Sequence, residues 1–181
     1  MTMLDRAFAS TSSILAKVQP DQLALPTPCA SWDVRALISH FTGSARWTAA
    51  TISGAEPDEG EPGEDFVAGY AESIRAALSA FAADSALDRT VSLPFGEFSG
   101  AALMALGARE QFTHGWDLAR AIGLPTDLDP DLADELLTEA RGAGLDAFRG
   151  PDGEAFFGAA TDAPAGASAA DRLAAFLGRA V

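Results

Sequence analysis

The sequence contains only one cysteine, Cys29, and two histidines, His40 and His114. A single cysteine excludes an internal disulfide framework and is typical of a protein from a reducing compartment. The N-terminal segment carries Asp5 and has no continuous apolar stretch, so we expect no signal peptide. We therefore predict a cytoplasmic protein.

Basic residues are also scarce: 12 Lys and Arg stand against 26 Asp and Glu, which gives a formal net charge of −14. Such a surface repels nucleic-acid phosphates and anionic lipid headgroups. No apolar run approaches the roughly 18 residues that a membrane-spanning helix needs. We therefore expect small-molecule partners, with no nucleic acid and no membrane. The sequence leaves a homodimer open.

Hydrophobic residues recur every three or four positions along six segments, as in amphipathic helices. Proline, glycine and N-capping side chains separate these segments. The predicted helices are residues 3–18, 32–53 after an N-cap at Ser31, 66–81, 100–122 after Ser99, a fifth opened by Asp129 and Pro130, and a short one after Ser168.

Two connections between these helices differ in kind. Residues 54–65 are rich in acidic residues, Gly and Pro, and predict a solvated loop. Residues 89–99 alternate briefly but contain Pro94 and Gly96, and predict an extended or hairpin-like connection rather than a sheet. We predict a single all-α domain over residues 1–181, an antiparallel four-helix bundle with a short extra helical tail.

Glu110 and His114 lie four residues apart in the predicted helix 100–122. At about 100° per residue, both fall within about 20° of Leu103, at the centre of an apolar stripe. A carboxylate and an imidazole at this spacing, directed into a bundle core, are one common way to supply two metal ligands. The alternative is a buried polar cluster without a metal.

A third ligand would come from a neighbouring helix, and His40 is the available candidate. It lies at the edge of the apolar stripe of helix 32–53, beside Leu37 and Ser44, where it would line a cleft between helices.

Three segments carry a family resemblance: LPTPCASWDVRALISHFTG, EQFTHGWDLARAIG and the closing DRLAAFLGRA. Together they resemble the DinB-like superfamily of bacterial four-helix metal-binding proteins. More closely, they resemble the actinobacterial group related to the metal-binding domain of mycothiol-dependent maleylpyruvate isomerase. The resemblance extends over essentially the whole sequence.

The resemblance implies an antiparallel bundle with a divalent metal, usually zinc, held by His40, Glu110 and His114. The isomerase carries a further C-terminal domain that contributes to its thiol and substrate site, and these 181 residues include no counterpart. We therefore do not expect maleylpyruvate isomerase activity itself.

Two imidazoles and one carboxylate leave a coordination position for water or substrate, as in catalytic zinc sites. Such a metal lowers the pKa of bound water, or holds an incoming thiol as the nucleophile. Because the family is associated with low-molecular-weight thiols, we predict a metal-dependent transferase or isomerase that uses a mycothiol-like thiol on small electrophiles. The alternative is a non-catalytic bundle that binds a metal or small molecule and serves as a sensor or partner protein.

Two further residues have two interpretations each. Asp117 follows His114 by three residues and could orient it as a hydrogen-bond acceptor, or it could be a surface carboxylate paired with Arg120. Cys29 could be a small packed residue or a reactive nucleophile. The tryptophans, Trp32 among them, are expected in the core or in a pocket wall.

Overall fold

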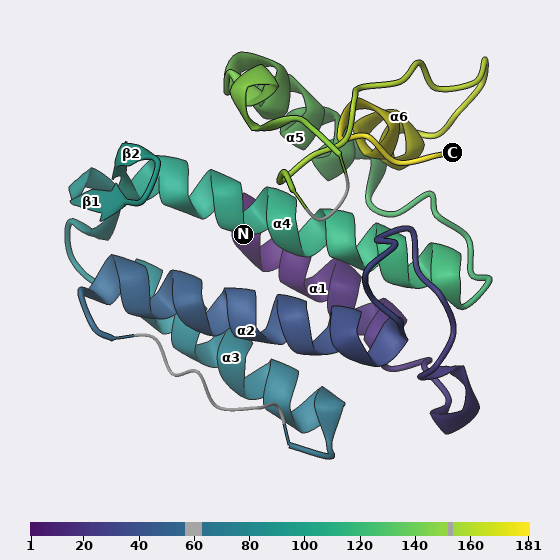
Figure 1. The fold of residues 1–181 in the computed structure, drawn as a ribbon. Coiled ribbons are helices and arrows are strands. Elements are labelled where there is room, and N and C mark those ends of the chain that lie inside the picture. Colours follow the sequence, from purple (N-terminus) through teal and green to yellow (C-terminus); the bar gives the residue numbers. More distant parts are fainter. Residues whose placement is uncertain (57–62, 152–153) are drawn as a thin grey trace.

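The computed structural model describes residues 1–56, 63–151 and 154–181, and these ranges contain six α-helices and one β-hairpin (Figure 1). The helices are α1 (Met3–Leu15), α2 (Val34–Ser53), α3 (Phe66–Phe81), α4 (Gly100–Ala121), α5 (Pro130–Gly142) and α6 (Ala169–Phe176). The strands are β1 (Thr90–Leu93) and β2 (Gly96–Ser99), and short 3-10 helices are η1 (Pro20–Gln22), η2 (Ala86–Asp88) and η3 (Leu145–Phe148). The predicted helical class is confirmed. Half of the predicted loop 54–65, residues 57–62, lies outside the described residues.

Helix α4 lies at the centre of the helical packing. Helix α1 runs alongside α4, α2 contacts both α3 and α4, and α5 and α6 pack together on the far side of α4 (Figure 1). Most residues between Leu103 and Ala119 are buried. Helix α4 is therefore buried along most of its length. No helix in the described ranges is long and apolar enough to cross a bilayer.

Large apolar side chains fill the space between the helices. Each such side chain stabilises the fold by about 1.5–3 kcal/mol when fully buried. The largest fully buried ones are Trp116, Tyr70, Phe8, Phe41 and Phe112.

Helix α2 begins two residues later than the sequence predicted. The N-cap is Asp33, whose carboxylate accepts a hydrogen bond from Ala36 N at 2.8 Å, so the predicted cap at Ser31 is wrong. The hydroxyl of Thr27 donates to the carbonyl oxygen of Trp32 at 2.8 Å, and Val34 N donates to Leu25 O at 3.0 Å. These bonds hold the preceding residues as a closed loop and delay the first helical turn.

The predicted caps of the later helices are correct. Ser99, Asp129 and Ser168 each accept a hydrogen bond from a backbone N–H in the first turn of α4, α5 and α6. The hairpin-like connection is confirmed, because β1 and β2 pair in antiparallel register from Thr90↔Ser99 to Leu93↔Gly96. The expectation that it would not form a sheet is wrong, because the two strands make a two-stranded sheet.

The C-terminal segment turns back sharply after α6. Gly178 has a φ of +88°, and its N–H and that of Arg179 donate to Ala175 O and Ala174 O, each at 3.0 Å. This pattern is a Schellman motif, which glycine favours because it has no Cβ. A Cβ on Gly178 would also lie 2.7 Å from Gly158 Cα. The turn directs Arg179 back toward α4.

Candidate functional site

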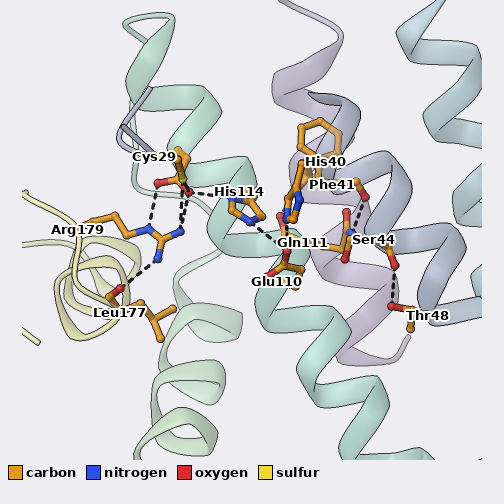
Figure 2. Close-up of polar contacts among 12 residues, drawn as sticks. Cys29, His40, Phe41, Ser44, Thr48, Glu110, Gln111, His114, Leu177 and Arg179 are labelled. Carbon is orange, nitrogen blue, oxygen red and sulfur yellow. Dashed lines mark hydrogen bonds and ion pairs between the residues drawn. The ribbon is translucent and has the colours of Figure 1, made fainter. Parts of the chain in front are cut away.

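The structure brings His40, Glu110 and His114 together between α2 and α4 (Figure 2). The Nε2 atom of His40 lies 2.6 Å from Glu110 Oε1, and the Nε2 atom of His114 lies 3.1 Å from the same oxygen. Each residue offers one donor atom, and the three atoms lie within 4.8 Å of one another. The described residues thus include a group that can hold a metal ion, and ligation by these three side chains stays a prediction.

The chemistry of this group fits a divalent transition metal. Imidazole nitrogen and carboxylate oxygen are common zinc ligands, and two such ligands at about 2.0–2.1 Å from a tetrahedral ion lie about 3.4 Å apart. The observed separations from Glu110 Oε1 are 2.6 and 3.1 Å. These separations, and the limit of 4.8 Å on all three, are close to the spacing of ligands around one ion.

Exposure to solvent differs across the group. The side chains of His40 and Glu110 are 34% and 30% exposed, whereas that of His114 is 6% exposed. The group is therefore open to solvent on the side of α2 and closed behind His114.

Asp117 lies behind His114 and is completely buried. Its Oδ2 atom is 3.0 Å from His114 Nδ1. Arg179 contacts both carboxylate oxygens, with Nε 3.2 Å from Oδ1 and Nη2 3.0 Å from Oδ2. The interpretation of Asp117 as a surface carboxylate paired with Arg120 is wrong, because the C-terminal segment covers this face of α4. The contact with His114 that the other interpretation requires is present.

The surroundings perturb the pKa values of Glu110, His114 and Asp117. Burial by itself would raise the pKa of Glu110, but the neighbouring His114 and His40 outweigh it and lower that pKa well below its usual value. Burial opposes the charged form of His114, but Glu110 and Asp117 raise its pKa well above the usual value. Despite burial, Arg179 and His114 lower the pKa of Asp117 to about 2. Both carboxylates are therefore ionised at neutral pH.

The hydrogen-bond partners of His114 determine which of its ring nitrogens carry protons. An ionised carboxylate only accepts, so Nδ1 of His114 must carry the proton that it shares with Asp117. Nε2 faces Glu110 and His40. Because Glu110 is also ionised and the pKa of His114 is raised well above its usual value, Nε2 carries a second proton in the metal-free protein.

Cys29 lies at the same buried carboxylate. Its Sγ atom donates to Asp117 Oδ2 at 3.4 Å and lies 3.8 Å from Arg179 Nη2. Cys29, His114 and Asp117 form a second group with ligand spacing. The guanidinium of Arg179 already supplies a positive charge there, which disfavours a second cation. Cys29 is half-buried in a polar contact.

Trp32 forms part of the wall of the site. Its ring centroid lies 4.2 Å from that of His40, with an interplanar angle of 31°, and 5.8 Å from that of His114. Trp116 is instead a core residue whose Nε1 donates to Asp171 at 2.8 Å. Both expected environments for tryptophan, core and pocket wall, therefore occur.

Sequence reasoning missed two residues of this region. Gln111 accepts a hydrogen bond from the hydroxyl of Tyr70 at 2.7 Å and donates to Phe41 O at 2.9 Å, which fixes α4 against α2 and α3 beside Glu110. A buried amide within an apolar helix was a visible signal. Arg179 had no local signal, because its partner Asp117 is distant in sequence.

Comparison with known proteins identifies the family. The family model described as "Mycothiol maleylpyruvate isomerase N-terminal domain" matches residues 4–119, a segment that contains His40, Glu110, His114 and Asp117. The chain belongs to this family. The family is associated with metal binding and with mycothiol, and the predicted resemblance is confirmed.

Two relatives are similar to this chain over nearly their whole length. They are uncharacterized proteins of Mycobacterium tuberculosis, from strains CDC 1551 and H37Rv. Each is 40% identical to this chain in an alignment that covers 97% of this chain and 95% of the relative. No solved structure gives a significant match.

Proposed function

We propose that the protein binds one divalent ion, zinc in the first instance, through His40, Glu110 and His114. We further propose that it uses this ion to activate a low-molecular-weight thiol of the mycothiol class for transfer to, or isomerisation of, small electrophiles. Helices α1–α4 serve in this proposal as the metal-binding four-helix bundle of a cytoplasmic protein.

The observation that carries the proposal is the convergence of three donor atoms on a solvent-accessible side of α2 and α4. Three protein ligands with an accessible fourth position are typical of catalytic zinc, whereas structural zinc is closed by four protein ligands. When bound, the ion supplies Lewis acidity that favours the anionic form of a thiol or water at neutral pH.

The charges around the site support an anionic ligand. Glu110 and Asp117 carry two negative charges, and Arg179 carries one positive charge. A divalent ion would leave one net positive charge, which a single anion such as a thiolate would balance. The net charge of −14 on the whole chain supports a small ligand rather than nucleic acid.

The chain's own residues would position the ligands and the thiol. Asp117 accepts from His114 Nδ1 and so directs Nε2 toward Glu110. Trp32 restricts the ring of His40 and forms an apolar surface beside the open side, where the carbon skeleton of a substrate would lie. No reaction step needs Cys29 in this scheme.

Elemental analysis of the purified protein tests the metal. We expect about one divalent ion per chain in the wild type, and a loss of most of it in His114→Ala, because one of three protein ligands disappears. A wild-type protein that is metal-free after gentle purification, and binds zinc no better than His114→Ala, would refute the proposal.

The second test uses cobalt-substituted protein and a thiol. Addition of mycothiol should produce a sulfur-to-cobalt absorption band, followed by conjugation of a model electrophile. Cys29→Ser should leave the band unchanged, because the added thiol supplies the sulfur. Loss of the band in Cys29→Ser would show that the protein supplies its own sulfur ligand. A metal-loaded protein that gives no band with any thiol would favour the non-catalytic alternative.

A further inference from the structure

We infer that Arg179, in the C-terminal segment, is a positioning residue of the proposed metal centre. It holds Asp117 in the orientation in which that carboxylate accepts from His114. The inference rests on the proposed function insofar as His114 is a ligand, and the contacts that carry it lie outside the three ligands themselves.

Polar contacts connect Arg179 of the C-terminal segment to Asp117, and Asp117 to His114 at the site. Arg179 meets Asp117 through two parallel contacts, Nε to Oδ1 at 3.2 Å and Nη2 to Oδ2 at 3.0 Å. The Oδ2 atom of Asp117 is also the one that lies 3.0 Å from His114 Nδ1. A two-point contact fixes the plane of the carboxylate as well as its position. The plane of the carboxylate in turn sets the direction of the bond to His114.

Arg179 is itself held in place by its own backbone. Its Nη1 atom donates to Leu177 O at 3.1 Å, which ties the guanidinium to the end of α6 (Figure 2). The Schellman turn at Gly178 sets the direction of the backbone at Arg179. The side chain of Arg179 is 12% exposed. Because its guanidinium is restrained and nearly buried, Arg179 can hold the Asp117 carboxylate in one orientation, which a mobile surface arginine could not do.

Asp117 needs this partner because it is completely buried. A buried carboxylate is strongly disfavoured without a cation and hydrogen-bond donors. Its other partners are His114 and the thiol of Cys29, and the thiol is a weak donor. Without Arg179, the only full positive charge beside the Asp117 carboxylate would be that of a protonated His114. A metal ion bound to His114 would replace the proton that carries this charge. Arg179 therefore matters most in the state in which His114 serves as a ligand.

Arg179 lies outside the segment that the family model matches. The matched segment ends at residue 119, and it contains the three proposed ligands and Asp117. Arg179 comes from the segment after α6. The C-terminal segment would thus complete the centre rather than merely cover α4.

The test compares Arg179→Met with Arg172→Met in the full-length protein. Arg172 is a matched control, because it lies in α6 and pairs with a carboxylate, Asp134, at 2.8 Å on the exposed surface. Two quantities are measured: zinc affinity by competition with a chromophoric chelator, and the His114 Nδ1–H proton signal in NMR spectra of the metal-free protein.

We expect Arg179→Met to weaken zinc binding about 10- to 100-fold, the usual effect of removing a group that orients a ligand. The Nδ1–H signal of His114 should be slowly exchanging in the wild type and in Arg172→Met, and lost or rapidly exchanging in Arg179→Met. A merely structural role would lower the melting temperature and leave both quantities unchanged, and that result would overturn the inference.

A double-variant cycle tests whether Arg179 acts through Asp117. In the background of Asp117→Asn, the change Arg179→Met should cost almost no further zinc affinity, because the Asp117 carboxylate through which Arg179 acts on His114 is already replaced. Full additivity of the two effects would overturn the inference. If Arg179→Met does not fold, Arg179→Lys takes its place, because it keeps the charge and removes the two-point contact, and it should weaken zinc binding to a smaller extent.

The two proposals can fail separately. If the wild type binds no zinc, the proposed function fails, and the His114 proton signal in the metal-free protein alone decides whether Arg179 positions His114. If zinc binds with normal affinity in Arg179→Met, the positioning role fails while the metal centre stands.

Discussion

Gly115 of α4 packs directly against Thr11 of α1. A Cβ on Gly115 would lie 2.4 Å from Thr11 Oγ1 and 3.2 Å from Thr11 Cα, and the same hydroxyl donates to Gln111 O at 2.7 Å. Gly115 directly follows His114 in the sequence, so this close contact between α1 and α4 sets the position of α4 at the site.

We therefore expect Gly115→Ala to destabilise the fold by about 1–3 kcal/mol, since the added methyl overpacks the contact between α1 and α4. Urea denaturation measures the change. Gly69→Ala in α3 is the control, because no neighbouring element comes within 4 Å of the point that its Cβ would occupy, and alanine favours helix. The control should leave stability unchanged or raise it by up to about 1 kcal/mol. Equal effects of the two substitutions would contradict the proposed close contact.

Zinc should stabilise the protein through Glu110. At a free concentration about 100 times its Kd, a ligand that binds only the folded state adds about 2.7 kcal/mol, which corresponds to a rise in Tm of about 5–10 °C for a chain of this size. Glu110→Gln should lose most of this rise, because the anionic ligand is removed. Glu72→Gln, the same change at an exposed position of α3, should keep it. Thermal unfolding with and without zinc gives the comparison, and an undiminished rise in Glu110→Gln would remove this residue from the ligand set.

Asp171 should make stability depend on acid pH. Its Oδ1 atom accepts hydrogen bonds from Trp116 Nε1 and from the hydroxyl of Thr126, each at 2.8 Å. Although burial opposes ionisation, these donors and Ser168 lower the pKa of Asp171 below its usual value. The stabilisation is therefore fully present above the unfolded-state pKa of about 3.9 and is lost as the pH falls through the lower, folded-state pKa.

The measurement is the difference in unfolding free energy between wild type and Asp171→Asn at pH 7 and at pH 2–3. We expect the wild type to be more stable at pH 7 and the difference to shrink at the lower pH. Asp162→Asn, at an exposed position, serves as the control and should show a small difference at both pH values. A difference in unfolding free energy between wild type and Asp171→Asn that stays constant with pH would show that ionisation of Asp171 does not contribute to stability.

Trp32 should contribute to metal affinity by restricting His40, whose ring centroid lies 4.2 Å away. Aromatic pairs of this kind are worth about 0.5–1.5 kcal/mol, so Trp32→Ala should raise the zinc Kd about 2- to 10-fold. Trp32→Phe should retain most of the affinity. Chelator competition measures both variants, and equal affinity in Trp32→Ala and wild type would show that the ring acts only as a wall.

Much of the helical framework could be predicted from the sequence because its causes are local. The 3.6-residue spacing of apolar side chains, and capping residues such as Ser99 and Asp129, act within one or two turns. The same periodicity placed Glu110 and His114 on one face of α4. The cap of α2 was predicted wrongly, because side-chain bonds within the preceding loop, such as that of Thr27 to Trp32, decide where that helix begins and leave no periodic pattern in the sequence.

The sequence by itself determined which residues α4 presents inward, since a helix fixes the direction of each side chain relative to its neighbours. Tertiary structure alone decided that His40 lies 2.6 Å from Glu110, because that distance depends on how α2 packs against α4. It also decided the partner of Asp117, which is Arg179 and not the nearby Arg120. Contacts between residues far apart in sequence depend on the path of the whole chain, and no local pattern encodes them.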